Sequence, residues 1–149
     1  MKLSTIQIFI LRLAVAALFL SLGWEKIQEG WLSNTAPLQE SLTNFHQHAT
    51  GFHLVYLDRV ALPFAGIWSK LIAIGETAVG VGLLLGLLVR LTCTAGILML
   101  LNLYAANGSL YSLHFFGSPW NALLTAALLI LLLSRAGRWV GIDAAFDPK

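Results

Sequence analysis

The chain has 149 residues, of which 58% are hydrophobic and only 11% are charged, and its mean hydropathy is +0.79. Because soluble domains carry about 25% charged residues, this composition excludes a globular protein that is surrounded by water. It predicts an integral membrane protein with one domain over residues 1–149 and the lipid bilayer as a partner. The formal net charge of +2 excludes nucleic acid as a partner, and the single Cys93 excludes an intramolecular disulfide.

Four apolar segments predict an all-α fold, a bundle of four transmembrane helices. They lie at about residues 6–27, 62–88, 91–106 and 119–133. The first segment has some features of a signal peptide, but Arg12 interrupts it and no A-x-A-like cleavage site lies between its apolar run, Ala14 to Leu22, and Trp24, so we expect a retained span. Only about three residues, Val89 to Leu91, link the second and third spans, which predicts a tight antiparallel hairpin.

The connection between the first two spans is too long for a simple loop. Pro37 is followed by Leu38, Leu42 and Phe45, and this spacing places the apolar side chains on one face of a helix. We therefore expect a short interfacial helix that lies on the extracytoplasmic surface or caps the bundle.

The basic residues predict the orientation of the chain in the membrane. With the N-terminus in the cytoplasm, three basic residues lie outside, namely Lys26, Arg59 and Lys70. Five lie inside, namely Lys2, Arg90, Arg135, Arg138 and Lys149. This excess favours an inner-membrane protein with four spans and with both termini in the cytoplasm.

Glycines are concentrated in the second span. Gly82 and Gly86 form a GxxxG motif, in which small residues allow helix backbones to approach closely. We interpret the motif as close packing within the bundle.

Glu76 lies near the middle of the second span, where a carboxylate costs about 2.5–3.5 kcal/mol on insertion scales. Arg12 interrupts the first span, and we expect the two side chains to lie within about one helical turn in depth and to form an ion pair. Such a pair can be a static connection that fixes helix register. It can also be a catalytic site, a polar pocket that binds a quinone headgroup or relays protons. A third alternative is that Glu76 faces another subunit.

Four further residues are candidates for binding a cofactor. Lys26 and Lys70 lie at the outer ends of the first two spans, where they either reach water or line the mouth of a pocket. Arg90 lies at the inner hairpin, where its simplest role is in topology. Asn121, like Asn102, lies in or near a span, and it forms either an interhelical hydrogen bond or a ligand contact.

The four histidines all fall on the outer side: His46, His48, His53 and His114. Their segregation raises the possibility of a metal or haem site. However, no carboxylate or cysteine pattern accompanies them, so we predict no metal and interpret them as polar residues at the interface.

Taken in order, the motifs resemble those of DoxX-like proteins. The resemblance rests on Leu11-Arg12, on Gly23-Trp24-Glu25-Lys26, on Glu76, Gly80, Gly86 and Arg90, and on Gly141-Ile142-Asp143. It covers nearly the whole chain. It implies a four-helix membrane bundle and, through the DoxD branch, a subunit of a thiosulfate:quinone oxidoreductase.

The function that the resemblance implies is a subunit of a redox complex, with a quinone as the cofactor and with other membrane or redox subunits as partners. The reaction would be quinone-linked oxidation of a sulfur compound such as thiosulfate. The alternative is a non-catalytic membrane scaffold that packs against a larger complex. A homo-oligomer is compatible with either function, and whether the chain belongs to an enzyme stays open.

Overall fold

The computed structural model describes residues 4–111 and 119–134, and within these ranges it is helical, with no strand. The helices are α1 (Thr5–Gln28), α2 (Ala36–His48), α3 (Phe52–Tyr56), the π-helix η1 (Leu57–Ala61), α4 (Ala65–Leu85), α5 (Val89–Ala106) and α7 (Pro119–Leu133). The four apolar segments and the short helix of the first connection are therefore all present as helices.

Three helices, α1, α4 and α5, are long and apolar enough to cross a membrane. The 24 residues of α1 extend over about 36 Å at 1.5 Å per residue, compared with about 30 Å for the hydrocarbon core of a bilayer. The 15 residues of α7 extend over only about 22 Å. Large apolar side chains on all four helices are exposed on the outside of the fold, as is usual for a protein surrounded by lipid.

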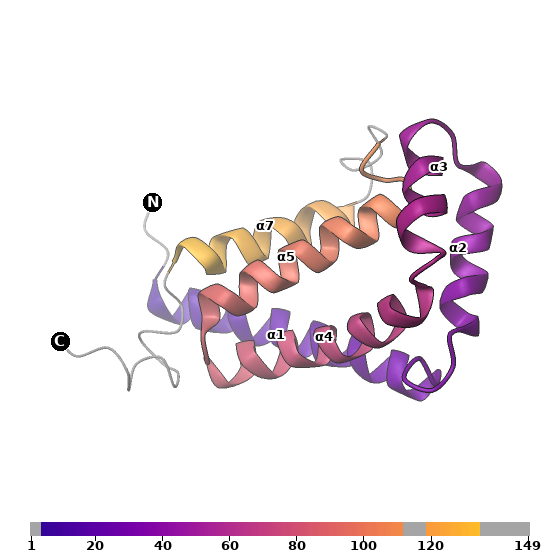
Figure 1. Cartoon of the computed structure of the whole chain (residues 1–149). Coiled ribbons are helices and arrows are strands. Elements are labelled where there is room, and N and C mark those ends of the chain that lie inside the picture. Colours follow the sequence, from indigo (N-terminus) through magenta and orange to yellow (C-terminus); the bar gives the residue numbers. More distant parts are fainter. Residues whose placement is uncertain (1–3, 112–118, 135–149) are drawn as a thin grey trace.

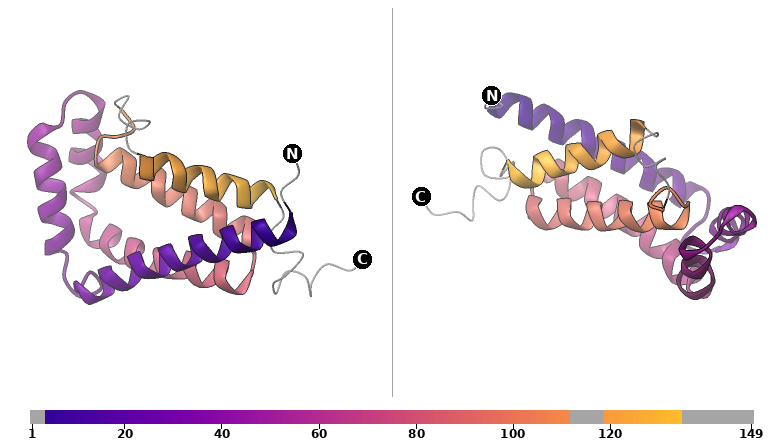
Figure 2. Two further views of the ribbon diagram at one scale, coloured as in Figure 1. Left: turned by 180° about the vertical axis from the view of Figure 1, so that it is seen from behind. Right: turned by 90° about the horizontal axis from the view of Figure 1, so that it is seen from above.

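The four apolar helices pack side by side (Figures 1 and 2). α1 lies along α4, α5 lies along α7, and the α4–α5 hairpin and the α1–α7 contact join the two pairs. α2 crosses one end of this arrangement, where it packs against α4 and η1 (Figure 1). The start of α1, the α4–α5 turn and the end of α7 lie at the opposite end.

Two glycines set the register between α1 and α4. A Cβ atom on Gly23 would lie 2.8 Å from the backbone nitrogen of Thr77, and one on Gly80 would lie 2.8 Å from that of Leu20. The two backbones therefore touch, and each step forward along α1 matches a step back along α4.

Two boundaries of the second predicted span are wrong, each for a local reason. α4 begins at Ala65 and not near residue 62, because Pro63 has no N–H and its ring opposes a helix interior. α4 ends at Leu85, since Gly86 adopts the left-handed conformation, with a φ of 65°, and terminates the helix. The turn is therefore Gly86–Leu88, three residues before the predicted link, and Arg90 lies in the first turn of α5.

The buried side chains form two clusters. The first joins α1, α4, α5 and α7 around Phe19, Leu83 and Leu128. The second lies at the α2 end of the molecule, where Leu38 and Leu42 of α2 contact residues of η1 and α4. This second cluster surrounds the candidate site.

Candidate functional site

Glu76 forms an ion pair with Lys26, at the α2 end of the α1–α4 interface. The Lys26 Nζ lies 3.3 Å from the Glu76 Oε2, and the two side chains are 18% and 8% exposed, respectively. Lys26 also lies over the ring of Trp31, with 5.2 Å between Nζ and the ring centroid. Nevertheless, Oε2 does not accept a well-aligned hydrogen bond from the described residues. The pair thus provides charge in a low-dielectric setting and retains hydrogen-bonding capacity.

The predicted ion pair between Arg12 and Glu76 is wrong. Continuing the α1–α4 register back from Leu20 places Arg12 level with residue 88, which is about 12 residues, or about 18 Å, from the level of Glu76. Arg12 is buried near the start of α1, where its guanidinium lies 5.2 Å from the centroid of the Phe9 ring. Depth along the first span was misjudged by about three helical turns, and Lys26 takes the place that was expected for Arg12.

A cavity of about 170 Å³ adjoins Lys26, between α2 and the ends of the long helices. Most of its lining is apolar or aromatic, and the polar groups are few. The lining residues are Lys26, Trp31, Leu38, Ser41, Leu42, Phe45, Tyr56, Ala61, Trp68, Ile72, Asn102, Leu103 and Ala106. A mostly apolar cavity with a few polar groups is the usual form of a small-molecule site.

The α4–α5 hairpin explains why this space exists. Gly82 faces Thr92 and Gly75 faces Met99, so the two helices touch from the turn up to this level. Beyond it the helices diverge toward α2 (Figure 1). The next facing positions on α4 and α5 line the cavity, with Ile72 near the level of Asn102 and Trp68 near that of Ala106.

Tyr56 and Asn102 form the second polar feature of the cavity. The Asn102 Nδ2 donates a hydrogen bond of 2.9 Å to the Tyr56 hydroxyl oxygen, which leaves the Tyr56 O–H free to donate elsewhere. Burial, together with the nearby Tyr111, raises the pKa of Tyr56, and the hydrogen bond from Asn102 acts in the opposite direction. Tyr56 is therefore a neutral donor at physiological pH.

The π-helix η1 follows Tyr56 directly. Its wider turn is closed by the Leu62 N–H, which donates to the Leu57 carbonyl at 2.9 Å. The Trp68 Nε1 donates to the Val60 carbonyl at 3.1 Å and so holds the indole against the cavity. Single π-helical turns occur frequently at functional sites.

The remaining predicted site residues lie in separate places. Lys70 is exposed and lines a groove on the other side of Trp31. Arg90 is exposed at the far end of the molecule. Asn121 is half-buried on α7, and its backbone carbonyl accepts a hydrogen bond of 3.3 Å from the Tyr104 hydroxyl. The structure therefore brings together Lys26 and Glu76 but not the other four residues.

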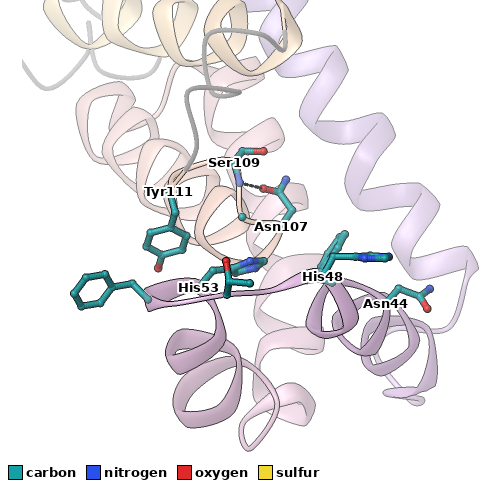
Figure 3. Close-up of a pocket in the computed structure, with 10 residues that line it drawn as sticks. Asn44, His48, His53, Asn107, Ser109 and Tyr111 are labelled. Atoms are coloured by element: carbon teal, nitrogen blue, oxygen red, sulfur yellow. Dashed lines mark hydrogen bonds between the residues drawn. The ribbon is translucent and has the colours of Figure 1, made fainter.

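Two of the outer histidines, His48 and His53, border a more open pocket of about 650 Å³ (Figure 3). The His53 Nε2 lies 2.9 Å from the Ala106 carbonyl, and the ring stacks on Tyr111. His46 lies outside this pocket and contacts Asp58 at 2.8 Å. His114 is not among the described residues. Within the described ranges, no group of three His, Cys, Asp or Glu side chains could hold a metal ion.

Sequence reasoning missed the contribution of α3 and η1 to the site. Tyr56 comes from the connection between the first two expected spans, and Trp68, which lies within the second expected span, was not among the candidate site residues. Asn102 was expected to form either an interhelical hydrogen bond or a ligand contact, and in the structure it donates a hydrogen bond to Tyr56 and lines the cavity. A usable signal was the apolar face of α2, since a helix that buries Leu38 and Leu42 must have residues beneath it.

Comparison with known proteins agrees with the resemblance in the motifs. No curated protein and no solved structure matches the chain. The family model described as DoxX matches residues 7–114, which include the whole candidate site. The Gly141-Ile142-Asp143 segment lies outside both this match and the described residues. Because the match extends over more than two thirds of the chain, and because the described helices are those of a membrane protein, this chain belongs to the DoxX family.

Proposed function

We propose that this protein is a quinone-binding subunit of a membrane redox complex, and that the cavity beneath α2 holds the quinone headgroup. The observation that carries the proposal is an ion pair, Lys26–Glu76, at the edge of an aromatic cavity that is otherwise almost free of charge. Intramembrane ionisable residues are rare because they are costly, and they commonly mark functional sites.

The residues that are present fit a quinone headgroup. A flat ring with two carbonyl oxygens needs aromatic or apolar walls and hydrogen-bond donors at its edge. Phe45 and Trp68 are suitable walls, and Lys26 and Tyr56 are suitable donors. The cavity volume of about 170 Å³ is that of a headgroup rather than of a whole isoprenoid quinone.

Each side chain then has a physical task. A bound quinone supplies an acceptor for two electrons and two protons. The Lys26 ammonium donates a hydrogen bond to an oxygen at the cavity edge and stabilises negative charge there. Glu76 balances the charge of Lys26 and, being 3.3 Å from it, is placed to take up or deliver a proton. α2 excludes water from the space beneath it.

The α4 glycines face other helices of the same chain, which favours a binding site over a scaffold as the function. A scaffold that packs on a larger complex is expected to turn a small-residue face outward, away from its own bundle. Here Gly75, Gly80 and Gly82 meet Met99, Leu20 and Thr92, which belong to neighbouring helices of the same chain. Of the two glycines in the GxxxG motif, Gly82 packs against α5 within the fold, whereas Gly86 ends α4 and does not belong to a helix face.

We place the protein in the inner membrane, with all four apolar helices as spans. In this arrangement α2, α3 and η1 lie on the extracytoplasmic side and both termini lie in the cytoplasm, as the positive-inside rule favours. Because the sequence resembles DoxD, thiosulfate is the first electron donor to be tested, together with co-purifying redox subunits. Reporter fusions to the C-terminus check the orientation.

The test is to purify the protein in mild detergent and to quantify the extracted quinone by mass spectrometry. The wild-type protein should retain quinone in proportion to protein, and Lys26→Gln should lower that ratio about tenfold, since a charge-assisted hydrogen bond contributes about 1.5–3 kcal/mol. Tyr56→Phe should lower it by a smaller factor. Arg59→Gln removes an exposed cation at the same end and serves as the matched control.

Two results would contradict the proposal. The first is that no quinone is retained while a larger membrane complex co-purifies, which is the result expected of a scaffold. The second is that Lys26→Gln and Arg59→Gln retain equal amounts. In a quinone-reduction assay with the native complex, Glu76→Gln should abolish turnover without loss of the inserted protein, and unchanged turnover would remove Glu76 from the mechanism.

A further inference from the structure

A second hollow lies on the outside of the molecule, where the loop between α1 and α2 meets the start of α4. Its volume is about 510 Å³. Its lining residues are Trp31, Leu32, Ser33, Asn34, Thr35, Pro63, Phe64, Gly66, Ile67, Lys70 and Leu71. Trp31 alone is shared with the cavity beneath α2, so the indole separates two distinct spaces. We call the outer one the Lys70 groove.

The Lys70 groove lies at the level of the membrane interface. The α1–α4 register places Lys70 opposite residue 30, just beyond the end of α1 at Gln28. Trp24, one turn inside that end, is exposed, and interfacial tryptophans commonly occupy this level. Lipid headgroups therefore lie beside the groove.

An apolar stripe leads from the groove toward the middle of the bilayer. Its members are large, exposed and spaced at three, four or seven residues along α4, so they share one helix face. They are Ile67, Leu71, Ile74, Val81 and Leu85. The first two also line the groove, so the groove and the stripe form one continuous surface.

The polar part of the groove is suited to an anion. Lys70 is the one charged residue among the lining residues, so no carboxylate lies in the wall to neutralise it. The Asn34 Oδ1 accepts from the Ala36 N–H at 2.9 Å, which fixes the side chain and leaves its amide N–H groups as donors. A phosphate accepts hydrogen bonds from both kinds of donor.

We propose that the Lys70 groove binds an anionic glycerophospholipid. The phosphate contacts Lys70 and Asn34, and one acyl chain lies along the α4 stripe. A free phosphate ester would contact only the polar part of this surface and leave the apolar stripe uncovered. A zwitterionic lipid would carry no net negative charge to balance the positive charge of Lys70. The site is separate from the cavity beneath α2 and does not depend on whether a quinone binds there.

The test is native mass spectrometry of the purified protein, after titration with equal amounts of phosphatidylglycerol and phosphatidylcholine of the same acyl chains. The wild-type protein should bind one phosphatidylglycerol in clear preference to phosphatidylcholine. Lys70→Gln should lower this preference about fivefold, as expected for one basic residue near the membrane surface. Asn34→Ala should lower it about threefold. The control, Arg59→Gln, removes an exposed cation at the same end but outside the groove and should leave the preference unchanged.

Three outcomes would overturn the proposal. One is that Lys70→Gln and Asn34→Ala both keep the wild-type preference. Another is that Arg59→Gln loses as much preference as Lys70→Gln, which would mean diffuse attraction to the surface. The third is that glycerol 3-phosphate displaces phosphatidylglycerol at equal concentration, which would identify a site for soluble phosphate esters. Because Lys70 is exposed, its variant should elute like the wild-type protein in size-exclusion chromatography.

Discussion

The Lys26–Glu76 ion pair makes a quantitative prediction about stability. At 3.3 Å and an effective dielectric constant of about 20, the attraction amounts to roughly 5 kcal/mol, against which the desolvation of both groups must be set. Removing one partner leaves the other charge buried. Replacing Lys26 and replacing Glu76 should lower the free energy of unfolding by different amounts. The reason is that the Glu76 side chain is 8% exposed, whereas Lys26 is 18% exposed and lies close to the end of α1.

We therefore expect Lys26→Met to lower the free energy of unfolding by about 3–5 kcal/mol, since it leaves an uncompensated carboxylate. Glu76→Gln should cost only about 1–2 kcal/mol, because the freed ammonium can extend toward water. The double variant should be more stable than the sum of the single effects predicts, by about 2–3 kcal/mol. The assay is unfolding by SDS in mixed micelles, followed by tryptophan fluorescence.

Lys70→Met is the matched control, because it removes an exposed lysine and should change stability by no more than about 0.5 kcal/mol. A coupling below about 0.5 kcal/mol between Lys26 and Glu76 would refute the ion pair. A larger loss of unfolding free energy for Glu76→Gln than for Lys26→Met would refute the argument that the more deeply buried charge is the more costly one to leave unpaired.

Four other perturbations test separate parts of the structure. The combination Arg12→Leu and Glu76→Gln should be additive in unfolding free energy, because the residues lie about 18 Å apart along the interface; coupling above 0.5 kcal/mol would restore the pair that we reject. Gly80→Ala should cost about 1–3 kcal/mol in the same assay, since its Cβ would meet the Leu20 backbone; Gly75→Ala should cost less, as it meets only the flexible end of Met99. Leu88→Gly should raise stability by up to about 1 kcal/mol, because a side chain at a φ of 46° is disfavoured, and a loss would show that the Leu88 side chain contributes more than its backbone costs. Ultraviolet titration of the wild-type protein, compared with Tyr56→Phe, should show that Tyr56 ionises above its ordinary pKa of 10.0, and that its pKa is higher still in Asn102→Ala. The stability linked to the neutral phenol is present below pH 10 and is lost as the pH rises through the raised pKa. Ionisation of Tyr56 below pH 10 would contradict the burial of this side chain.

Hydrophobicity and helix punctuation were sufficient to predict the helices. All four apolar segments and a short helix containing Pro37 to Phe45 were expected, and all are present as helices, the short one as α2. The errors fall at Pro63 and Gly86, where a single residue ends helical geometry within a run that is apolar on both sides. Hydropathy averages over such residues and therefore extends a span across them.

The partner of Glu76 could not be predicted in the same way, because it depends on how α1 and α4 slide against each other. Hydropathy defines a span to within a few residues, but it does not say which glycine faces which backbone. The contacts of Gly23 and Gly80 decide this, and a different register would have favoured Arg12 over Lys26. The cavity was equally hidden, since it results from the divergence of α4 from α5 and from the folding of α2 over the gap.

Because of the π-helix η1, the geometry of the site depends on the number of residues in this segment as well as on their identity. A π-helical turn contains one residue more than an α-helical turn requires, so it is the kind of feature that a single-residue insertion creates. Deleting one residue within Leu57–Ala61 would close the turn to α-helix and rotate everything before it by about 100° relative to α4. Tyr56 would then turn away from Asn102. Natural variation in this segment should therefore be tolerated as substitution but not as a change in length, and relatives that lack the extra residue are expected to differ in what they bind.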